Sequence, residues 1–166
     1  MRFLKVLLVI VVAVTVSGCA SKFKTYNGPE VTQVIVNKGA RKMYLFHHGE
    51  VLESYDFALG FAPVGDKEIE GDGKTPEGDY LIDRRNPNSK FYLSIGIDYP
   101  NEQDIAEALA LGEKPGGDIF IHGRPTGVKF RPDRRDWTAG CIAVTNREMR
   151  DIYAMVKNGT PIRINP

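Results

Sequence analysis

Short stretches in which apolar and polar residues alternate recur along the chain from position 31 onward. Alternation of this kind, rich in β-branched and aromatic residues and bounded by Gly, Pro or Asn, predicts β-strands. His47, His48, Gly49 and Glu50 lie between two such stretches and predict a hairpin turn that contains glycine. The strands we expect cover residues 31–36, 42–46, 51–59, 80–82, 91–97, 118–122, 141–144 and 161–164.

Two segments carry the features of helices instead. Asn101 is a capping residue for the first, which is rich in Ala and Leu and ends at Gly112. Thr145 and Glu148 have capping-box spacing at the start of the second, which should run to about position 157. Many short strands with only two helices predict a mainly β fold, a β-sandwich or barrel with two short helices added.

The first 18 residues form a separate segment. Arg2 and Lys5 precede an apolar run at 6–16, which is short for a membrane span but suits a signal peptide. Small residues before Cys19 resemble a bacterial lipobox, so we expect a lipoprotein signal peptide over residues 1–18 and lipidation of Cys19. A plain secretory signal with an incidental cysteine, or a short membrane anchor, is the alternative.

Residues 19–30 then form a lipidated tether to a domain at 31–166, and the lipid anchors the protein to a membrane. Ala20 follows Cys19 where a retention signal would need Asp. In a host with two membranes, we therefore expect an exported lipoprotein at the periplasmic face of the outer membrane. We also expect a monomer.

Charge and cysteine content narrow the classes of function. Lys and Arg number 22 and Asp and Glu 21, so a globally basic nucleic-acid-binding protein is not indicated. The chain has two cysteines, and if Cys19 is lipidated, Cys141 has no partner for an intramolecular disulfide. A single cysteine left in an exported protein is a candidate reactive thiol, and the alternative is a small buried core residue.

Two motifs in the Gly- and Asp-rich segment at 60–80 are rejected. Gly73-Lys74-Thr75 ends like a phosphate-binding loop, but Glu68 stands where that motif needs Gly, and Pro76 follows where it needs a helix. Residues 66–77 have the acidic spacing of a calcium loop but contain Pro76 and lack flanking helices. We therefore expect a solvated connection here, and no metal or organic cofactor.

The stretch at 121–146 carries the candidate chemistry. It holds His122 and Cys141, separated by a loop with five basic residues: Arg124, Lys129, Arg131, Arg134 and Arg135. A thiol, an imidazole and a basic loop are the parts of a cysteine acyl-transfer site for an acidic substrate. The papain-like order, with Cys upstream of His, is reversed here.

This stretch resembles the signature of the L,D-transpeptidase (YkuD-type) catalytic domain, in which His-Gly precedes Ser/Thr-x-Gly-Cys by about fifteen residues. Here His122-Gly123 precedes the motif at 138–141, and Thr75-Pro76-x-Gly78 is also typical of that family. The resemblance implies a β-sandwich and acyl transfer on peptidoglycan stem peptides. Two positions depart from the pattern, Ala139 and Ala143, where many members have His and Arg. The region near position 137 is similar to a lipoprotein-like subgroup that includes hydrolytic members.

The roles expected of these residues follow from the chemistry and from the resemblance. Cys141 is the nucleophile, and His122 is its base in a thiolate–imidazolium pair. The resemblance implies that a backbone carbonyl near Gly123 orients His122, with Asp136 as the rival. The expected oxyanion donors are the N–H groups of three consecutive residues, Ala139, Gly140 and Cys141.

Four further residues are candidates for substrate binding. Arg124 and Arg135 are the candidates among the loop arginines. They either bind stem-peptide carboxylates or remain in solvent. The Thr138 hydroxyl is either an additional donor or a structural group, and Trp137 is either a wall of the site or part of the core.

In the expected reaction, Cys141 forms a thioester and expels a D-residue, and the acyl group passes to an amine or to water. Two alternatives stay open: a hydrolytic L,D-endopeptidase or carboxypeptidase, and a wall-binding lipoprotein without activity.

Overall fold

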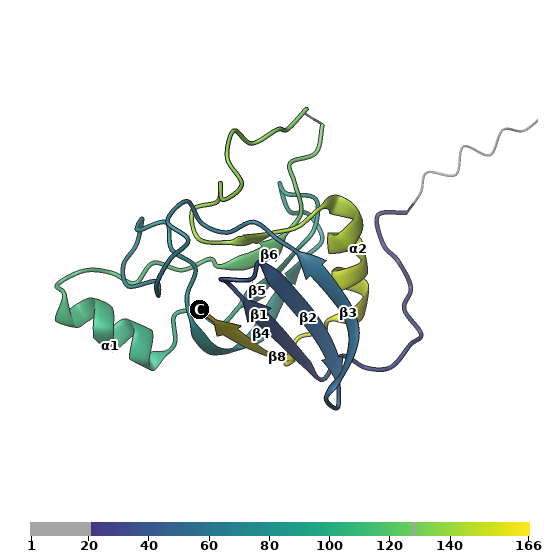
Figure 1. The fold of residues 1–166 in the computed structure, drawn as a ribbon, viewed down its shortest axis with the longest axis horizontal. Helices are drawn as coiled ribbons and strands as arrows, with labels where there is room; N and C mark the ends of the chain where they lie inside the picture. The colour runs from purple at the N-terminus through teal and green to yellow at the C-terminus, as the bar shows by residue number, and fades with distance from the viewer. Residues whose placement is uncertain (1–20, 128) are drawn as a thin grey trace, which may run out of the picture.

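The computed structural model of the protein describes residues 21–127 and 129–166, so the expected signal peptide and Cys19 lie outside the described residues. Eight strands and two helices follow one another along the chain (Figure 1). Their bounds are β1 (Gln33–Asn37), β2 (Lys42–His47), β3 (Glu50–Asp56), β4 (Gly78–Asn86), β5 (Ser94–Ile97), α1 (Glu102–Ala110), β6 (Phe120–His122), β7 (Ile142–Ala143), α2 (Asn146–Met155) and β8 (Pro161–Asn165). The mainly β fold with two short helices is confirmed.

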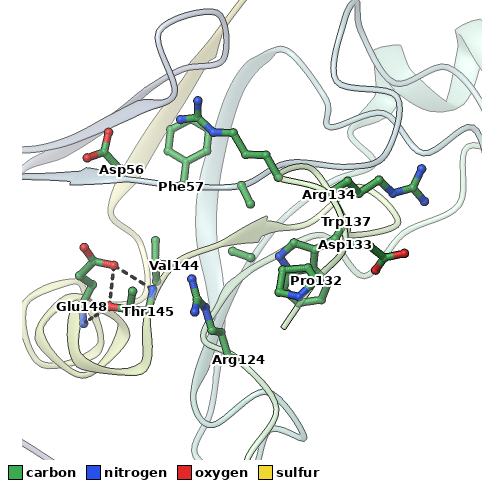
Figure 2. Close-up of a pocket in the computed structure, with 13 residues that line it drawn as sticks. Asp56, Phe57, Arg124, Pro132, Asp133, Arg134, Trp137, Val144, Thr145 and Glu148 are labelled. Atoms are coloured by element: carbon green, nitrogen blue, oxygen red, sulfur yellow. Dashed lines mark hydrogen bonds between the residues drawn. The ribbon is translucent and has the colours of Figure 1, made fainter. Parts of the chain in front are cut away.

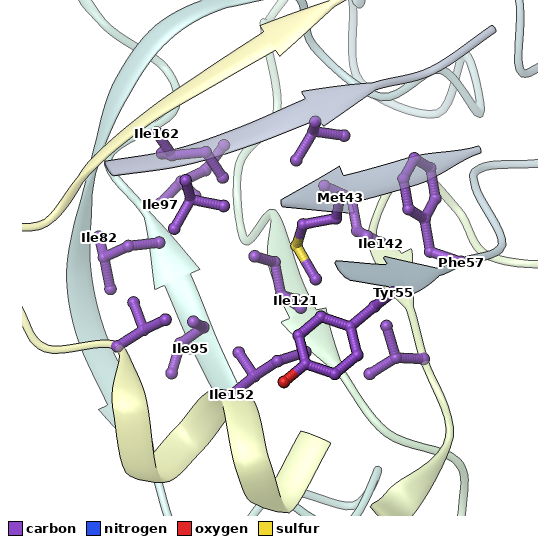
Figure 3. Close-up of a cluster of buried hydrophobic side chains, with 14 of the residues drawn as sticks. Met43, Tyr55, Phe57, Ile82, Ile95, Ile97, Ile121, Ile142, Ile152 and Ile162 are labelled. Atoms are coloured by element: carbon purple, nitrogen blue, oxygen red, sulfur yellow. The ribbon is translucent and has the colours of Figure 1, made fainter. Parts of the chain in front are cut away.

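The expected sandwich is a single sheet that folds over on itself. Its strand order is β3-β2-β1-β8-β4-β5-β6-β7, and β4 belongs to both halves. The first part of β4 pairs with β8 and the second part with β5, with a register shift between Ile82 and Arg84. Side chains from β2 and β3, such as Met43 and Tyr55, therefore lie opposite Ile95 and Ile121 of the other half (Figure 3).

The chain after β3 closes this folded sheet. The strand predicted at 51–59 leaves the hairpin after Asp56, and Ala58 pairs with Ala143 through two hydrogen bonds of 2.8 Å. Gly60 makes a further bridge to Thr138. The end of the hairpin thus lies directly beside the segment that precedes β7.

Two strands differ from the prediction, each for a local reason. β4 extends through Arg84 and Arg85, predicted as loop, because both residues pair with β5. Their guanidinium groups also lie over aromatic rings, 4.8 Å from the centroid of Phe120 and 3.8 Å from that of Tyr153. The strand predicted at 91–97 begins only at Ser94, because Tyr92 has a φ of 75°. The residues before Ser94 therefore leave the ladder.

Both helices begin with the predicted caps. Asn101 and Thr145 each close a capping box, and α2 buries Met149, Ile152 and Met155 against the core. Within the described residues, no helix has the length and apolar character needed to cross a bilayer. In the described part of the expected tether, Lys24 pairs with Asp151 of α2, its Nζ lying 2.8 Å from Asp151 Oδ1.

The connection between β3 and β4 is not simply a solvated loop. Lys38 and Lys67 are 2% and 4% exposed, and both place their ammonium groups inside it. Lys67 Nζ donates to Ile69 O and Asp72 Oδ1, both at 2.8 Å. Buried charges must be paired. Here Lys38 pairs with Glu77 and Lys67 with Asp72, so lysines supply the positive charge that a metal would supply in a calcium loop.

Candidate active site

Two neighbouring strands bring the candidate histidine and cysteine into the lining of the same pocket. His122 is the last residue of β6, and Cys141 immediately precedes β7. The strands pair in parallel, with Ile121 opposite Ile142. This register sets Cys141 level with Phe120, two positions before His122. Residues two apart in a strand lie on the same face of the sheet, so both reactive side chains can share one pocket.

The His122 ring is buried and has a fixed orientation. Its side chain is 3% exposed, and Nδ1 lies 2.6 Å from the carbonyl oxygen of Gly123. Because a carbonyl only accepts, Nδ1 carries the proton, and Nε2 is left as the acceptor. Burial lowers the pKa of His122, although the bond to Gly123 acts in the opposite direction.

Gly123 is required at its position by close packing. A Cβ there would lie 2.4 Å from Asn146 Oδ1 and 2.9 Å from Phe91 O. Asn146 Oδ1 also accepts from the N–H of Arg124 at 2.6 Å. The start of α2 thus holds the peptide whose carbonyl orients His122.

Asp136 does not orient His122, contrary to the rival assignment. Its carboxylate accepts from Arg41 Nη2 at 2.7 Å and from the N–H of Leu59 at 2.9 Å. Partial burial tends to raise the pKa of Asp136, but these bonds outweigh it and hold the pKa below its usual value. Asp136 fastens the loop before Trp137 to the end of the hairpin.

The Cys141 thiol is not bonded to the imidazole in this conformation. Its Sγ accepts from the N–H of Phe120 and donates to Asp118 O, both at 3.4 Å. Among the described residues, the structure records no hydrogen bond between Sγ and His122. Burial raises the pKa of the thiol, which favours its neutral form.

The turn before Cys141 is held by the Thr138 hydroxyl. Thr138 Oγ1 donates to Cys141 O at 2.6 Å and accepts from the N–H of Gly140 at 3.2 Å. The N–H of Gly140 is therefore already engaged. Within the described chain, the N–H groups of Ala139 and Cys141 make no hydrogen bond to another residue, and these two remain as donors.

The pocket above the thiol has a volume of about 670 Å³. His122, Cys141 and Ala139 line it together with a polar segment that sequence reasoning did not single out: Asn86, Asn88, Ser89 and Lys90. Trp137 forms a wall of this pocket, with its ring centroid 5.7 Å from that of His122. The sequence feature that could have indicated this segment is its polar composition directly before Phe91. The ring centroid of Phe91 lies 4.5 Å from that of His122.

Three of the four loop arginines, Arg124, Arg134 and Arg135, line a different pocket of about 420 Å³ (Figure 2). It lies between the first turn of α2, at Thr145 and Glu148, and the loop that includes Asp133 and Arg134. Arg124 and Arg135 line it, but His122 and Cys141 do not. The structure therefore separates these arginines from the thiol pocket, and the wall that both pockets share includes Trp137.

Fold and site together define a mainly β protein with a cysteine–histidine site at one edge of a folded sheet. The sequence matches the L,D-transpeptidase catalytic domain (YkuD) family over residues 32–164, and the chain belongs to this family. The expected family, and with it the expected fold, are confirmed.

Among curated proteins, the chain is 30% identical over 109 residues to YafK of Escherichia coli K12, named as a candidate L,D-transpeptidase. The match covers 64% of this chain and 38% of YafK. Among solved structures, it resembles the helical cell shape determining protein Pgp2 of Campylobacter jejuni, with 29% identity and a TM-score of 0.63. That match covers 84% of this chain and 49% of Pgp2, so the chain spans less than half the length of either relative.

An L,D-transpeptidase of Mycobacterium smegmatis has the same fold, with a TM-score of 0.54 and 15% identity over 82% of this chain and 59% of that one. At this level of identity the similarity is one of fold.

Proposed function

We propose that the protein catalyses cysteine-dependent acyl transfer on peptidoglycan stem peptides, with Cys141 as nucleophile and His122 as base. One observation carries the proposal: His122 of β6 and Cys141, directly before β7, line the same pocket, where the Nε2 of His122 is free to accept a proton. An activated thiol needs a base with an unprotonated nitrogen. The position of Cys19 and the sequence before it support export as a lipoprotein, which we propose as the route to this substrate.

The chemistry balances with these residues alone. Sγ attacks the carbonyl on the L-centre side of a D-residue, while Nε2 takes the thiol proton. The N–H groups of Ala139 and Cys141 are the proposed donors to the oxyanion. As the C–N bond breaks, the imidazolium returns the proton to the departing amine. The thioester then passes to an acceptor amine, or to water in the hydrolytic case.

Hydrolysis is the second candidate function, and Ala143 favours it. Many members of the family have Arg at this position, whereas here only a methyl group points from β7, and its backbone is bonded to Ala58. Without that guanidinium, the site has more room for the water that would hydrolyse the thioester. The arginines of the neighbouring 420 Å³ pocket are the proposed alternative contact for a carboxylate.

The test is to incubate the purified protein with defined muropeptides and to identify the products by mass. Cross-linked products indicate transfer, and loss of the terminal D-residue or cleavage of cross-links indicates hydrolysis. We expect Cys141→Ala to abolish both reactions with the fold unchanged, because Cys141 is the described thiol that lines the pocket. Turnover by the Ala variant would contradict the cysteine mechanism, and an inactive wild-type protein would favour a wall-binding role.

A further inference from the structure

We propose that the Thr75 hydroxyl is a positioning group that directs the Cys141 N–H toward the reacting carbonyl. The inference rests on the proposed function, since it concerns how an oxyanion would be bound. Thr75 belongs to the connection before β4, 66 positions before the nucleophile in sequence numbering, and lines neither pocket. It acts through the Gly140–Cys141 peptide rather than by touching substrate.

The hydroxyl is built into the protein interior. The Thr75 side chain is fully buried, and Oγ1 donates to Gly140 O at 2.7 Å. The same oxygen lies 3.5 Å from the N–H of Gly60, which donates to it. A buried hydroxyl with both a donor and an acceptor in reach has a fixed orientation.

The backbone of Thr75 is fixed as firmly as its side chain. Lys38 Nζ donates to Thr75 O at 2.7 Å, to Gly65 O at 2.6 Å and to Glu77 Oε1 at 2.8 Å. The ammonium group therefore has three acceptors, and the Lys38 side chain is buried away from solvent. Lys38, in turn, sets the distance between this connection and the turn after β1.

The consequence for Cys141 follows from peptide geometry. In a trans peptide the C=O and the N–H point in opposite directions. Because Gly140 O is directed inward to Thr75, the N–H of Cys141 is directed away from the connection. Cys141 lines the thiol pocket, and its N–H makes no hydrogen bond to another residue of the described chain. The donor is thus kept free on the side where substrate would lie.

The conformation of Gly140 makes this orientation specific. Its φ is 136°, and a Cβ would lie 2.7 Å from Lys74 O, so only glycine fits. A glycine can rotate its peptides more freely than other residues. A bond to its carbonyl is therefore needed to hold one orientation, and Thr75 supplies it.

The experiment compares two reactions of Cys141 in full-length Thr75→Val. Acylation by a carbapenem passes through an oxyanion, whereas alkylation by iodoacetamide displaces iodide and forms none. We expect acylation, followed by intact mass, to be roughly ten- to a hundredfold slower, somewhat less than the loss of a whole oxyanion donor. Alkylation should change by less than about twofold, because the thiol itself is untouched.

Two further variants separate positioning from general stability. Thr75→Ser keeps the hydroxyl and should restore acylation to near the wild-type rate. Thr160→Val is a matched control, because Thr160 is also buried but its backbone carbonyl accepts from the N–H of Ile82 in β4. This variant should change neither reaction. Thr75→Ala removes the hydroxyl without adding a methyl group and should behave like Thr75→Val.

Three results would overturn the inference. They are an unchanged rate of acylation in Thr75→Val, an equal loss of acylation and alkylation, and a loss in Thr75→Ser as large as in Thr75→Val. If neither hydroxyl-free variant folds, Thr75 serves stability alone and the inference fails. A wild-type protein that is alkylated but neither acylated nor active on muropeptides would instead remove the proposed function.

Discussion

The position of two protons decides what Cys141 and His122 can do. The sequence led us to expect a thiolate–imidazolium pair, but burial raises the pKa of the thiol and lowers that of the imidazole. Both shifts favour the neutral form of each group, and the thiol proton is directed to Asp118 O. In the proposed reaction the proton moves to Nε2 only as the thiol leaves Asp118 to attack, which is general-base catalysis.

Removing the base should therefore reduce turnover far more than thiol reactivity. We expect His122→Ala to slow turnover on muropeptides roughly 10²–10⁴-fold, the usual range for a positioned acid–base group. The raised pKa leaves little thiolate at neutral pH, so alkylation of wild-type Cys141 should be slow there and should keep rising beyond about pH 9, past the ordinary thiol pKa. The measurement is the rate of iodoacetamide alkylation against pH for both proteins.

The alkylation deficit of His122→Ala should be smaller than its turnover deficit. It should shrink as the pH rises past the raised thiol pKa, because the thiolate then forms without a base. His47→Ala and His48→Ala are the matched controls, since both residues lie at the β2–β3 hairpin, where the His47 ring contacts Glu30 O. They should change neither rate. Superimposable alkylation curves together with full turnover would show that His122 does not act on the thiol.

At the scale of elements, the connection between β3 and β4 supports the catalytic turn. It carries Thr75 to Gly140 O, while the bridge from Gly60 to Thr138 holds the other side of that turn. Asp136 adds a third link through Arg41 and the N–H of Leu59. The candidate nucleophile thus sits on a turn fixed by segments that come before β4 in the chain.

Lys38 is the central support of this connection, and Lys38→Met should be strongly destabilising. The change removes an ammonium group that is 2% exposed and leaves three acceptors without a partner, Glu77 among them. We expect a loss on the order of 3 kcal/mol in the free energy of unfolding, as for other buried pairs broken at one partner. Urea denaturation, followed by circular dichroism, measures it.

Lys42→Met is the control for that change. Lys42 also pairs with a carboxylate, at 3.1 Å from Asp56 Oδ1, but both side chains are largely exposed, 39% and 69%. An exposed ion pair contributes less than about 1 kcal/mol. Equal effects of the two substitutions would mean that the buried ammonium does not hold the connection.

At the scale of the molecule, one folded sheet builds both the core and the site. β4 bends between its two halves, and the segment after β3 then reaches β7. The shortest strands, β6 and β7, lie at the end of the strand order, where a short strand edge opens to a pocket. The described residues therefore carry the whole candidate site, and anchoring through Cys19 is a separate proposal.

That anchoring role is tested by Cys19→Ser. We expect this variant to incorporate no labelled fatty acid and to leave the membrane fraction, because Ser offers no thiol for lipidation. Cys141→Ser is the matched control and should keep both the label and the membrane association. Continued labelling of Cys19→Ser would show that the lipobox interpretation is wrong.

Local patterns determined the elements and the reactive pair. The strands and caps follow from alternation and from side chains that bond to nearby backbone, so they could be predicted within a few residues. His122 and Cys141 were likewise found from a short motif. These features depend on neighbours in sequence, which is why sequence alone was enough.

Tertiary structure decided which distant groups meet. Only the folded sheet shows that Gly123 O orients His122, that Asp136 bonds Arg41, and that three of the loop arginines line another pocket than the thiol. It also buries Lys67 and Thr75, which lie in a Gly- and Asp-rich segment predicted to be solvated. The reason is physical: a buried polar group must find its partner wherever the fold places one, and that partner carries no local signal.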